Sequence, residues 1–305
     1  MEFVSLARRL TTTAGVVAGA SALVFGTAAP ALASTNAVNP PTVPVVGQGV
    51  SALPIGSAGN PDHVMGSAIR AHEGTVSSPN SRPNSLPKFT PNSGQNGSQS
   101  SGQTPGLDVS HYQGTINWAS VKSKGAKFAY MKATEGTSFR DSQFNNNYTG
   151  SYNQGIIRGA YHFARPDVSA GAAQADYFVA HGGGWSSDGK TLPGLLDIEW
   201  GSSDEGGDCY GYSQSDMSNW IASFVNEYHA KTTRWPVIYT ATSWWSECTG
   251  TSASFGNNDP LMIARYSSSV GSLPHGWSVY TIWQFADSGT FPGDQDRFNG
   301  DITRV

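Results

Sequence analysis

The sequence is poor in cysteine and in charged side chains, since only 2 of its 305 residues are cysteine and 13% are Asp, Glu, Lys or Arg. Neither Cys-x-x-Cys nor His-Glu-x-x-His occurs, which disfavours redox and zinc chemistry. A Gly-x-Ser-x-Gly elbow is also absent, which disfavours a serine hydrolase. Outside the N-terminus, no stretch approaches the ~20 apolar residues of a membrane-spanning helix. We therefore expect a protein with no cofactor, no metal and no place in a membrane.

The balance of charge is mildly acidic, with 22 acidic against 18 basic residues. A nucleic-acid partner is not expected, because the phosphate backbone requires a basic surface. Aromatic residues make up 11% of the chain, so rings, hydroxyls and amides take the places that charges usually occupy. Such a composition suits a sugar-binding cleft, but it is equally common in secreted proteins.

The N-terminus has the features of an export signal. Arg8 and Arg9 precede an apolar run of small residues over 14–29, which closes with Ala31-Leu32-Ala33. We interpret residues 1–33 as a signal peptide and predict a secreted, extracellular protein. The paired arginines leave the twin-arginine route open beside the general one.

The segment after the expected signal peptide has the composition of a spacer. Residues 34–105 are rich in Pro, Gly, Ser, Asn and Thr, so we interpret them as a disordered spacer or prosegment. Within it, residues 62–72 have the pattern of a weak helix, to which we assign no function. Cys209 and Cys248 are the only cysteines, and in an oxidising compartment they are expected to form one disulfide.

From residue 106 to 305, apolar strand candidates alternate with stretches of helical spacing. The strand candidates are 107–110, 128–133, 159–163, 195–199, 236–241, 261–266, 280–285 and 301–305, and the helical stretches are 118–124, 144–154, 170–181 and 217–231. This order predicts an α/β fold, an eight-stranded β/α barrel of TIM-like type with five β/α units followed by three strands that lack full helices. An open doubly wound sheet is the alternative. It is disfavoured because no Gly-x-Gly-x-x-Gly turn follows a strand.

The segment Leu195-Leu196-Asp197-Ile198-Glu199-Trp200 carries the clearest chemical signal. Alternation along a strand places Asp197 and Glu199 on one side, with Cα atoms about 6.6 Å apart. Two neighbouring carboxyl groups resist ionising together, so one of them stays protonated and can act as a general acid. This arrangement predicts a glycosidase that retains configuration. An exposed acidic strand end, or one that binds a cation, is the alternative.

Other polar residues stand at the predicted strand ends, where barrel enzymes carry their sites. Asp108 is a candidate for the acidic site, although a single Asp there is also a common cap of a turn or helix. Candidate substrate-binding residues are Tyr112, Gln113, Glu135, Tyr161, Phe163, Trp200, Tyr239, Trp283 and Gln284, and for each aromatic ring core packing is the alternative. His162 is interpreted as a hydrogen-bonded residue of the core or of the layer behind the site.

Five motifs in order resemble the Chalaropsis-type lysozymes, glycoside hydrolase family 25. They are Gly106-Leu107-Asp108-Val109-Ser110-His111-Tyr112-Gln113-Gly114, Tyr130-Met131-Lys132-Ala133-Thr134-Glu135-Gly136, Gly159-Ala160-Tyr161-His162-Phe163, Leu196-Asp197-Ile198-Glu199 and Ile282-Trp283-Gln284-Phe285. The resemblance implies a β/α barrel, here residues 106–305, that cleaves the β-1,4 bond between N-acetylmuramic acid and N-acetylglucosamine in peptidoglycan.

The same resemblance implies roles for four acidic residues. Glu199 would protonate the leaving oxygen, and Asp197 would stabilise the anomeric centre or orient the substrate's acetamido group. Asp108 would complete the acidic site. The family's Asp-x-Asn-x-Phe pattern reads Asp294-Gln295-Asp296-Arg297-Phe298 here, so Asp294 is the fourth candidate and Asp296 departs from the pattern.

Two other functions remain as alternatives. A chitinase-like endo-N-acetylglucosaminidase would carry Asp-x-x-Asp-x-Asp-x-Glu, of which only the part that ends at Asp197 and Glu199 is present. A cell-wall-binding module without activity would keep the aromatic residues and lose the carboxylates. We expect a monomeric, secreted peptidoglycan hydrolase.

Overall fold

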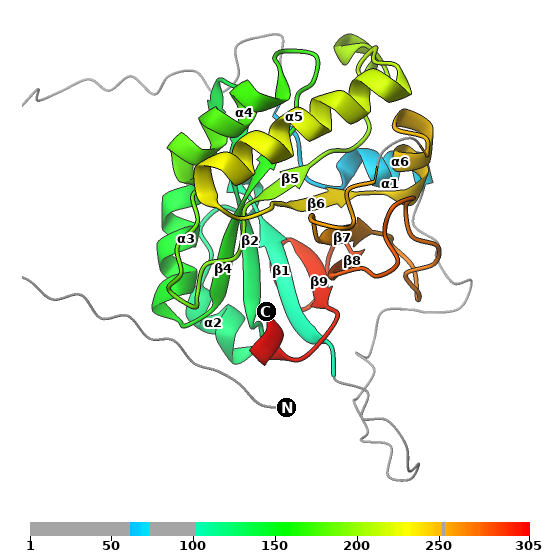
Figure 1. The fold of residues 1–305 in the computed structure, drawn as a ribbon. Coiled ribbons are helices and arrows are strands. Elements are labelled where there is room, and N and C mark those ends of the chain that lie inside the picture. The colour runs from blue at the N-terminus through cyan, green and yellow to red at the C-terminus, as the bar shows by residue number, and fades with distance from the viewer. Residues whose placement is uncertain (1–61, 74–101, 252–253) are drawn as a thin grey trace, which may run out of the picture. The chain divides into compact units, whose positions relative to one another are not determined.

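The computed structural model describes residues 62–73, 102–251 and 254–305, and within them eight strands close into a barrel (Figure 1). Seven neighbouring strands run parallel, and the eighth, β9, lies antiparallel between β8 and β1. A short strand, β3 (Phe139–Arg140), is added to β2 outside the ring. The barrel strands are β1 (Thr104–Val109), β2 (Phe128–Glu135), β4 (Ile157–Phe163), β5 (Leu195–Asp197), β6 (Val237–Thr240), β7 (Leu261–Ala264), β8 (Ile282–Ala286) and β9 (Asp294–Phe298).

Both faces of the strands are buried, as the apolar runs of the sequence predict. All eight residues of β2 are buried, and from Phe128 to Lys132 they alternate between the barrel interior and the layer under the helices, before a β-bulge between Lys132 and Thr134 shifts the register. Phe128 points inward and fills the space beside Gly106 on β1, where a Cβ atom would overlap the ring. Ala129 and Met131 point outward and pack against Trp118 of the next layer.

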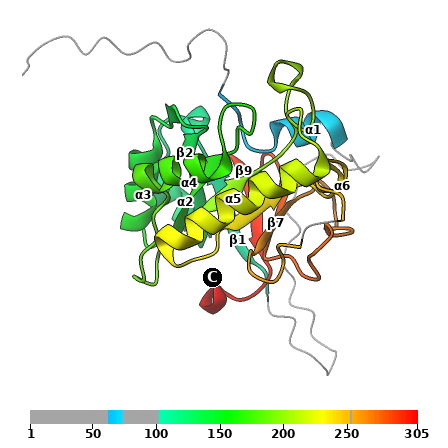
Figure 2. The same cartoon turned by 45° about the horizontal axis from the view of Figure 1, so that its top comes forward.

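Helices follow each of the first five parallel strands and cover the outside of this part of the barrel, and Figure 2 shows α4 and α5 crossing it side by side. Ser213 caps α5 by accepting from the backbone N–H of Asp216, and Asn117 caps α2 in the same way. The helices are α2 (Trp118–Ser123), α3 (Phe144–Asn153), α4 (Gly171–Phe178), α5 (Gln214–Thr232) and α6 (Thr242–Cys248). With α6, which the sequence analysis did not assign, the five expected β/α units are confirmed.

The last third of the barrel has loops in place of helices, as predicted. Loop residues such as Leu273 and Trp277 cover the outer faces of β7 and β8. The predicted position of the eighth strand was wrong. Residues 302–304 form a 3-10 turn capped by Asp301, and the strand is β9. Its sequence, DQDRF, is polar because its inward carboxyl groups belong to a buried polar cluster, so an apolar pattern could not reveal it.

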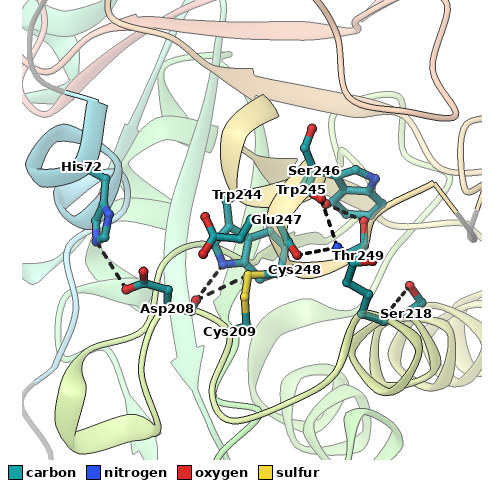
Figure 3. Close-up of a disulfide and its surroundings, with 11 residues drawn as sticks. His72, Asp208, Cys209, Ser218, Trp244, Trp245, Ser246, Glu247, Cys248 and Thr249 are labelled. Carbon is teal, nitrogen blue, oxygen red and sulfur yellow. Dashed lines mark hydrogen bonds and ion pairs between the residues drawn. A yellow bond between two sulfur atoms is a disulfide. The ribbon is translucent and has the colours of Figure 1, made fainter.

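Cys209 and Cys248 form the predicted disulfide, with their Cα atoms 5.3 Å apart. It joins the loop after β5 to the C-terminal end of α6. Figure 3 shows that the backbone carbonyl of Asp208, next to Cys209, also accepts a hydrogen bond from the indole of Trp244. The bridge therefore fixes the loop that follows Glu199.

Residues 62–73, within the range expected to be a spacer, end in a short helix, α1 (Ser67–Glu73). Met65 and Ile69 are buried in the same apolar cluster as Leu195 and Tyr239 of the barrel. The expected signal peptide and the rest of the spacer up to residue 101 lie outside the described residues. Within the part of the chain that the structure describes, no helix has both the length and the apolar character needed to cross a membrane.

Candidate active site

Asp197 and Glu199 lie at the carboxyl end of β5, and both are completely buried. The backbone N–H of Ile198 donates to the carbonyl of Tyr239 at 3.0 Å, so the pairing with β6 continues past Asp197. Because side chains alternate along an extended chain, Asp197 and Glu199 then point to the same side. We call these two residues the acid pair, and the opening at the carboxyl ends of the parallel strands the mouth of the barrel.

The surroundings of the acid pair favour its protonated forms. Burial, and then the charge of Glu199, raise the pKa of Asp197 well above its usual range. Burial raises the pKa of Glu199 to about 7, against the effect of two backbone N–H groups that donate to its oxygens, from Gly66 at 2.6 Å and Ile69 at 3.3 Å. The pair therefore holds a proton at neutral pH.

A second acidic group lies where β1, β8 and β9 meet. The register places Asp108 on β1 opposite Asp294 on β9, and the side-chain amide of Gln284 on β8 donates to both, at 2.7 and 3.3 Å. The side-chain oxygen Oε1 of Gln284 accepts from the hydroxyls of Tyr239 at 2.7 Å and Tyr266 at 2.8 Å. Burial raises the pKa of Asp108 to about 7, and burial together with the charge of Asp108 raises that of Asp294 to about 9.

Asp294 and Asp296 occupy different depths of the barrel. Asp294 pairs with Asp108, near the end of β1, whereas Asp296 pairs with Gly106, two residues further from the mouth. Burial raises the pKa of Asp296 well above its usual range, and the charges of Asp108 and Asp294 raise it further. Of the two residues, Asp294 is thus the one that lies at the depth of Asp108, near the mouth.

The opposite side of the mouth is charged. Lys132 is fully buried on β2 and donates to Glu135 at 2.7 Å, and a guanidinium nitrogen of Arg165 lies 3.5 Å from Glu135. Another nitrogen of Arg165 lies 3.0 Å from Glu205, in the loop after β5. Although burial alone would raise the pKa of Glu135, hydrogen bonds from His63 and the charge of Lys132 hold it well below its usual range. The mouth therefore combines carboxyl groups that hold protons with carboxylates that do not.

Three aromatic rings of the predicted set border the acid pair. Tyr161 and Phe163 lie inward on β4, and Phe163 pairs with Asp197 in the strand register. Trp200 follows Glu199 directly and is 5% exposed. Flat rings beside a carboxyl pair are suited to stacking against the faces of sugar rings.

The family model of the glycosyl hydrolases family 25 matches residues 107–294, which run from the middle of β1 to the first residue of β9 and include every acidic residue of the mouth described above. The chain belongs to glycosyl hydrolase family 25. It is a glycosidase. The strand order, the polar ends of the strands and the buried acid pair agree with the expectation drawn from its motifs.

Relatives of this family 25 enzyme cover different shares of its chain. Lysozyme M1 of Streptomyces globisporus is 42% identical over an alignment that covers 99% of this chain and 96% of that protein. The N,O-diacetylmuramidase of a Chalaropsis species is 49% identical over 66% of this chain and 96% of its own length. A family 25 lysozyme structure from Aspergillus fumigatus has a TM-score of 0.64 and is 49% identical over 67% of this chain and 97% of that chain.

The structure brings most of the predicted site residues of this family 25 enzyme together at the mouth. They are Asp108, Glu135, Tyr161, Phe163, Asp197, Glu199, Trp200, Tyr239, Gln284 and Asp294, and the half-exposed Tyr112 lies at the rim. His162 points outward, accepts or donates hydrogen bonds with Thr134 and Gln174, and is fully buried, so its interpretation as a core residue is confirmed.

Two predicted substrate-binding residues are not placed in the site. Trp283 lies on the outer face of β8, packs with Leu261 and Ile263, and donates its indole N–H to the carbonyl of Arg265. Alternation makes this necessary, because its neighbour Gln284 points inward. The side-chain oxygen Oε1 of Gln113 accepts from the backbone N–H of Ser110 at 2.8 Å as part of a capping box, so this side chain stabilises the turn after β1.

The sequence analysis missed several residues of the mouth. Lys132 has a signal in the sequence, because it is the one charged residue in the otherwise apolar stretch 128–133. Tyr266, Arg165 and Glu205 come from loops, where no periodic pattern marks their direction. In the ranges that the structure describes, no group of three or more His, Cys, Asp or Glu side chains is arranged to hold a metal ion.

Proposed function

We propose that the chain is an N-acetylmuramidase that hydrolyses the β-1,4 bond between N-acetylmuramic acid and N-acetylglucosamine in peptidoglycan, with Glu199 as the general acid. One observation carries the proposal. Glu199 is completely buried beside Asp197, with a pKa raised to about 7. A carboxyl group that is protonated near neutral pH can donate to the leaving oxygen. The names of the relatives, lysozyme and N,O-diacetylmuramidase, support this substrate.

Asp197 is proposed to position the substrate's own acetamido group. Neither of its oxygens has a hydrogen-bond partner among the described residues, so both are available to an N–H group of the sugar. The acetamido oxygen attacks the anomeric carbon while the proton of Glu199 passes to the glycosidic oxygen and the bond to that oxygen breaks. Asp197 accepts from the acetamido N–H and stabilises the positive charge that develops on the ring.

The second half of the reaction restores the enzyme. The Glu199 carboxylate takes a proton from a water molecule, whose oxygen attacks the anomeric carbon and opens the bicyclic intermediate. Glu199 is again protonated, and the product keeps the configuration of the substrate. A thiazoline analogue of this intermediate is expected to inhibit the enzyme, and to bind more weakly to Asp197→Asn. Equal binding to both proteins would contradict the assisted route.

The remaining residues of the mouth are proposed to bind and orient the glycan. Gln284 holds Asp108 and Asp294 beside the acid pair through its two N–H donors. Phe163 and Trp200 offer flat faces for sugar rings, and Tyr112 extends the surface at the rim. The chitinase-like alternative is less well supported because only the end of its motif is present, and the inactive wall-binding module because all four acidic residues are present.

The test is lysis of purified cell walls by residues 102–305, followed by analysis of the new reducing ends. Glu199→Gln should reduce the rate on the order of 10² to 10⁴-fold, because the proton donor is lost. Glu247→Gln, at an exposed position, is the matched control. New reducing ends should be N-acetylmuramic acid. Reducing ends of N-acetylglucosamine would instead identify chitinase-like cleavage.

We also propose that the protein is exported and acts outside the cell as a monomer, without nucleic-acid or membrane partners. Arg8, Arg9 and the apolar run after them support a signal peptide over 1–33, and the Cys209–Cys248 disulfide suits an oxidising compartment. Residues 34–61 and 74–101 are proposed as spacer or prosegment. N-terminal sequencing of protein from the culture medium tests the signal, since an N-terminus upstream of residue 34 would contradict it.

A further inference from the structure

Residues 62–73 fill the mouth of the barrel. Met65 and Ile69 are 1% and 0% exposed, and both pack into the barrel's apolar cluster. This stretch, which we call the 62–73 segment, ends about thirty residues before β1 begins. Its contacts therefore join parts of the chain that are remote in sequence.

The segment binds the proposed general acid directly. The backbone N–H of Gly66 donates to one oxygen of Glu199 at 2.6 Å, and that of Ile69 donates to the other at 3.3 Å. Both oxygens are thus occupied, and a glycosidic oxygen could not reach them. Both N–H donors also lower the pKa of Glu199 against the effect of burial, and so oppose the protonated form that a general acid needs.

The segment also places opposite charges beside the charged residues of the mouth. Asp62 forms an ion pair with Lys132. The imidazole of His63 lies between two carboxylates, with Nδ1 at 2.7 Å from Glu135 and Nε2 at 3.0 Å from Glu205. Although burial alone would lower the pKa of His63, the hydrogen bonds to these carboxylates raise it to about 9. His63 is therefore positively charged at neutral pH and forms ion pairs with both carboxylates.

Two rings of the segment cover the aromatic residues that are proposed to bind sugar. His63 stacks on Phe163 with ring centroids 4.6 Å apart and planes 12° apart. His72 stacks on Trp200 at 4.2 Å and 5°. Flat imidazole rings thus lie where flat sugar faces are expected to lie.

Contacts at the rim hold the segment on several sides. Arg70 pairs with Asp287, after β8, at 2.7 Å, and Glu73 is hydrogen-bonded to Ser243, at the start of α6. The hydroxyl of Tyr112, after β1, donates to the carbonyl of Asp62 at 3.0 Å. Nε2 of His72 also lies 3.8 Å from an oxygen of Asp208, and Figure 3 shows the two side chains facing each other. The segment is therefore anchored across the whole mouth.

We propose that the 62–73 segment is an autoinhibitory element that keeps the enzyme latent, and that proteolytic separation of this segment from residues 102–305 activates it. The proposal rests on the proposed function only in taking the mouth as the place where the glycan binds. The barrel does not need the segment to fold in relatives, because the Aspergillus lysozyme matches this chain over 97% of its own length but over only 67% of this chain.

The first experiment compares the full chain before and after it is cut. A recognition sequence for a specific protease is inserted between Glu73 and Gly102, and wall lysis is measured at nanomolar enzyme. A segment that binds in trans with a Kd of about 10 μM, at an effective concentration of about 1 mM, should suppress the uncut rate about 100-fold. Cutting should raise the rate to that of residues 102–305. Equal rates before and after cutting would overturn the proposal.

A substitution within the segment separates inhibition from a role in stability. Gly66 has φ +74°, and a Cβ atom there would overlap the hydroxyl of Tyr266 and lie 2.9 Å from that of Tyr239. Gly66→Val should therefore expel the segment and activate the uncut chain. Ser67→Val, at the exposed next position, should leave it latent. If the segment only stabilises the fold, Gly66→Val will lower the melting temperature without raising the rate.

Binding of a synthetic peptide of residues 62–73 to the fragment 102–305 is measured by calorimetry, which needs no substrate. One-to-one binding that Gly66→Val abolishes in the peptide supports the proposal even if the fragment fails to lyse walls, a failure that would count against the proposed function alone. Absence of binding at millimolar peptide would overturn the proposed inhibition.

Discussion

Asp108 on β1 and Asp294 on β9 face each other across an antiparallel strand pair, and one amide, that of Gln284, donates to both. The same side chain accepts from the hydroxyls of Tyr239 and Tyr266. It therefore satisfies four buried polar groups that come from four strands or strand ends.

Replacing Gln284 should weaken the fold and the activity together. Gln284→Leu leaves the two hydroxyls and the two carboxyl groups without this partner, and each unsatisfied buried group costs about 1–3 kcal/mol. Because these groups can partly relax toward one another, the free energy of unfolding should fall by about 2–5 kcal/mol. Urea denaturation measures it, with Gln154→Leu at an exposed position as the control. An unchanged unfolding midpoint would mean that the amide does not support the cluster.

Asp296 should make the protein less stable as the pH rises. Its folded-state pKa is raised well above the usual range by burial and by Asp108 and Asp294, so its contribution to stability is present below pH 3.8 and is lost as the pH rises. Asp296→Asn, which restores the amide of the family pattern, removes this titration. The unfolding free energy of Asp296→Asn minus that of the unsubstituted protein should therefore increase between pH 4 and pH 8. A difference that stays constant with pH would contradict this account.

Binding of the 62–73 segment should weaken at alkaline pH. The pKa of His63 rises from 6.5 to about 9 in its site between Glu135 and Glu205, with Lys132 and Arg165 as the nearby cations. Its contribution is thus complete below pH 6.5 and is lost as the pH rises through 9. The measurement is the affinity of the 62–73 peptide for residues 102–305 between pH 6 and 9.5.

A His63→Gln peptide is the control for that titration, because every other group is common to both complexes. The advantage of the unsubstituted peptide should shrink as the pH increases. A ratio of the two affinities that does not change with pH would exclude His63 as the titrating group.

The disulfide should add stability mainly by restricting the unfolded chain. Cys209 and Cys248 are 39 residues apart, for which the chain-entropy model gives about 4 kcal/mol. A reducing agent should lower the melting temperature of the protein to that of the Cys209→Ser/Cys248→Ser double variant. The double variant itself should be insensitive to reduction. If reduction leaves the melting temperature unchanged, the bridge contributes little.

Two tryptophans on opposite sides of the barrel wall should differ in their effect on substrate binding. In residues 102–305, Trp200→Leu removes a stacking surface worth about 1–1.5 kcal/mol, so KM should rise about tenfold. Trp283→Leu changes the outer face of β8 and should alter stability but not KM. A similar rise in KM for both variants would argue against stacking at Trp200.

The parallel part of the barrel could be predicted from the sequence because its strands are apolar on both faces and its helices have periodic apolar positions. Asp197 and Glu199 could be paired for the same reason, since alternation in an extended strand has only two outcomes. Alternation also explains the error at Trp283. Of two neighbours on a strand only one points inward, so Trp283 and Gln284 could not both line the mouth. Only their contacts in the folded protein show that Gln284 is the inward residue.

Other features depend on contacts that are remote in sequence. β9 is polar because its carboxyl groups find Asp108 and Gln284 inside the barrel, so no apolar pattern marks it. The position of the 62–73 segment depends on Glu199, Lys132 and Glu135, all more than sixty residues away along the chain. Val64, Met65 and Ile69 were its helical signal, and that signal does not identify a partner.

The antiparallel direction of β9 also bears on the order in which the enzyme can be assembled. The seven parallel strands precede β9 in the chain, and the ring has no contact between β8 and β1 until β9 is inserted between them. Without residues 294–298, therefore, the seven parallel strands would form an open sheet in which β8 and β1 have no partner on one side. Since Asp294 arrives with that same strand, an unfinished chain contains neither a closed wall nor a complete acidic centre.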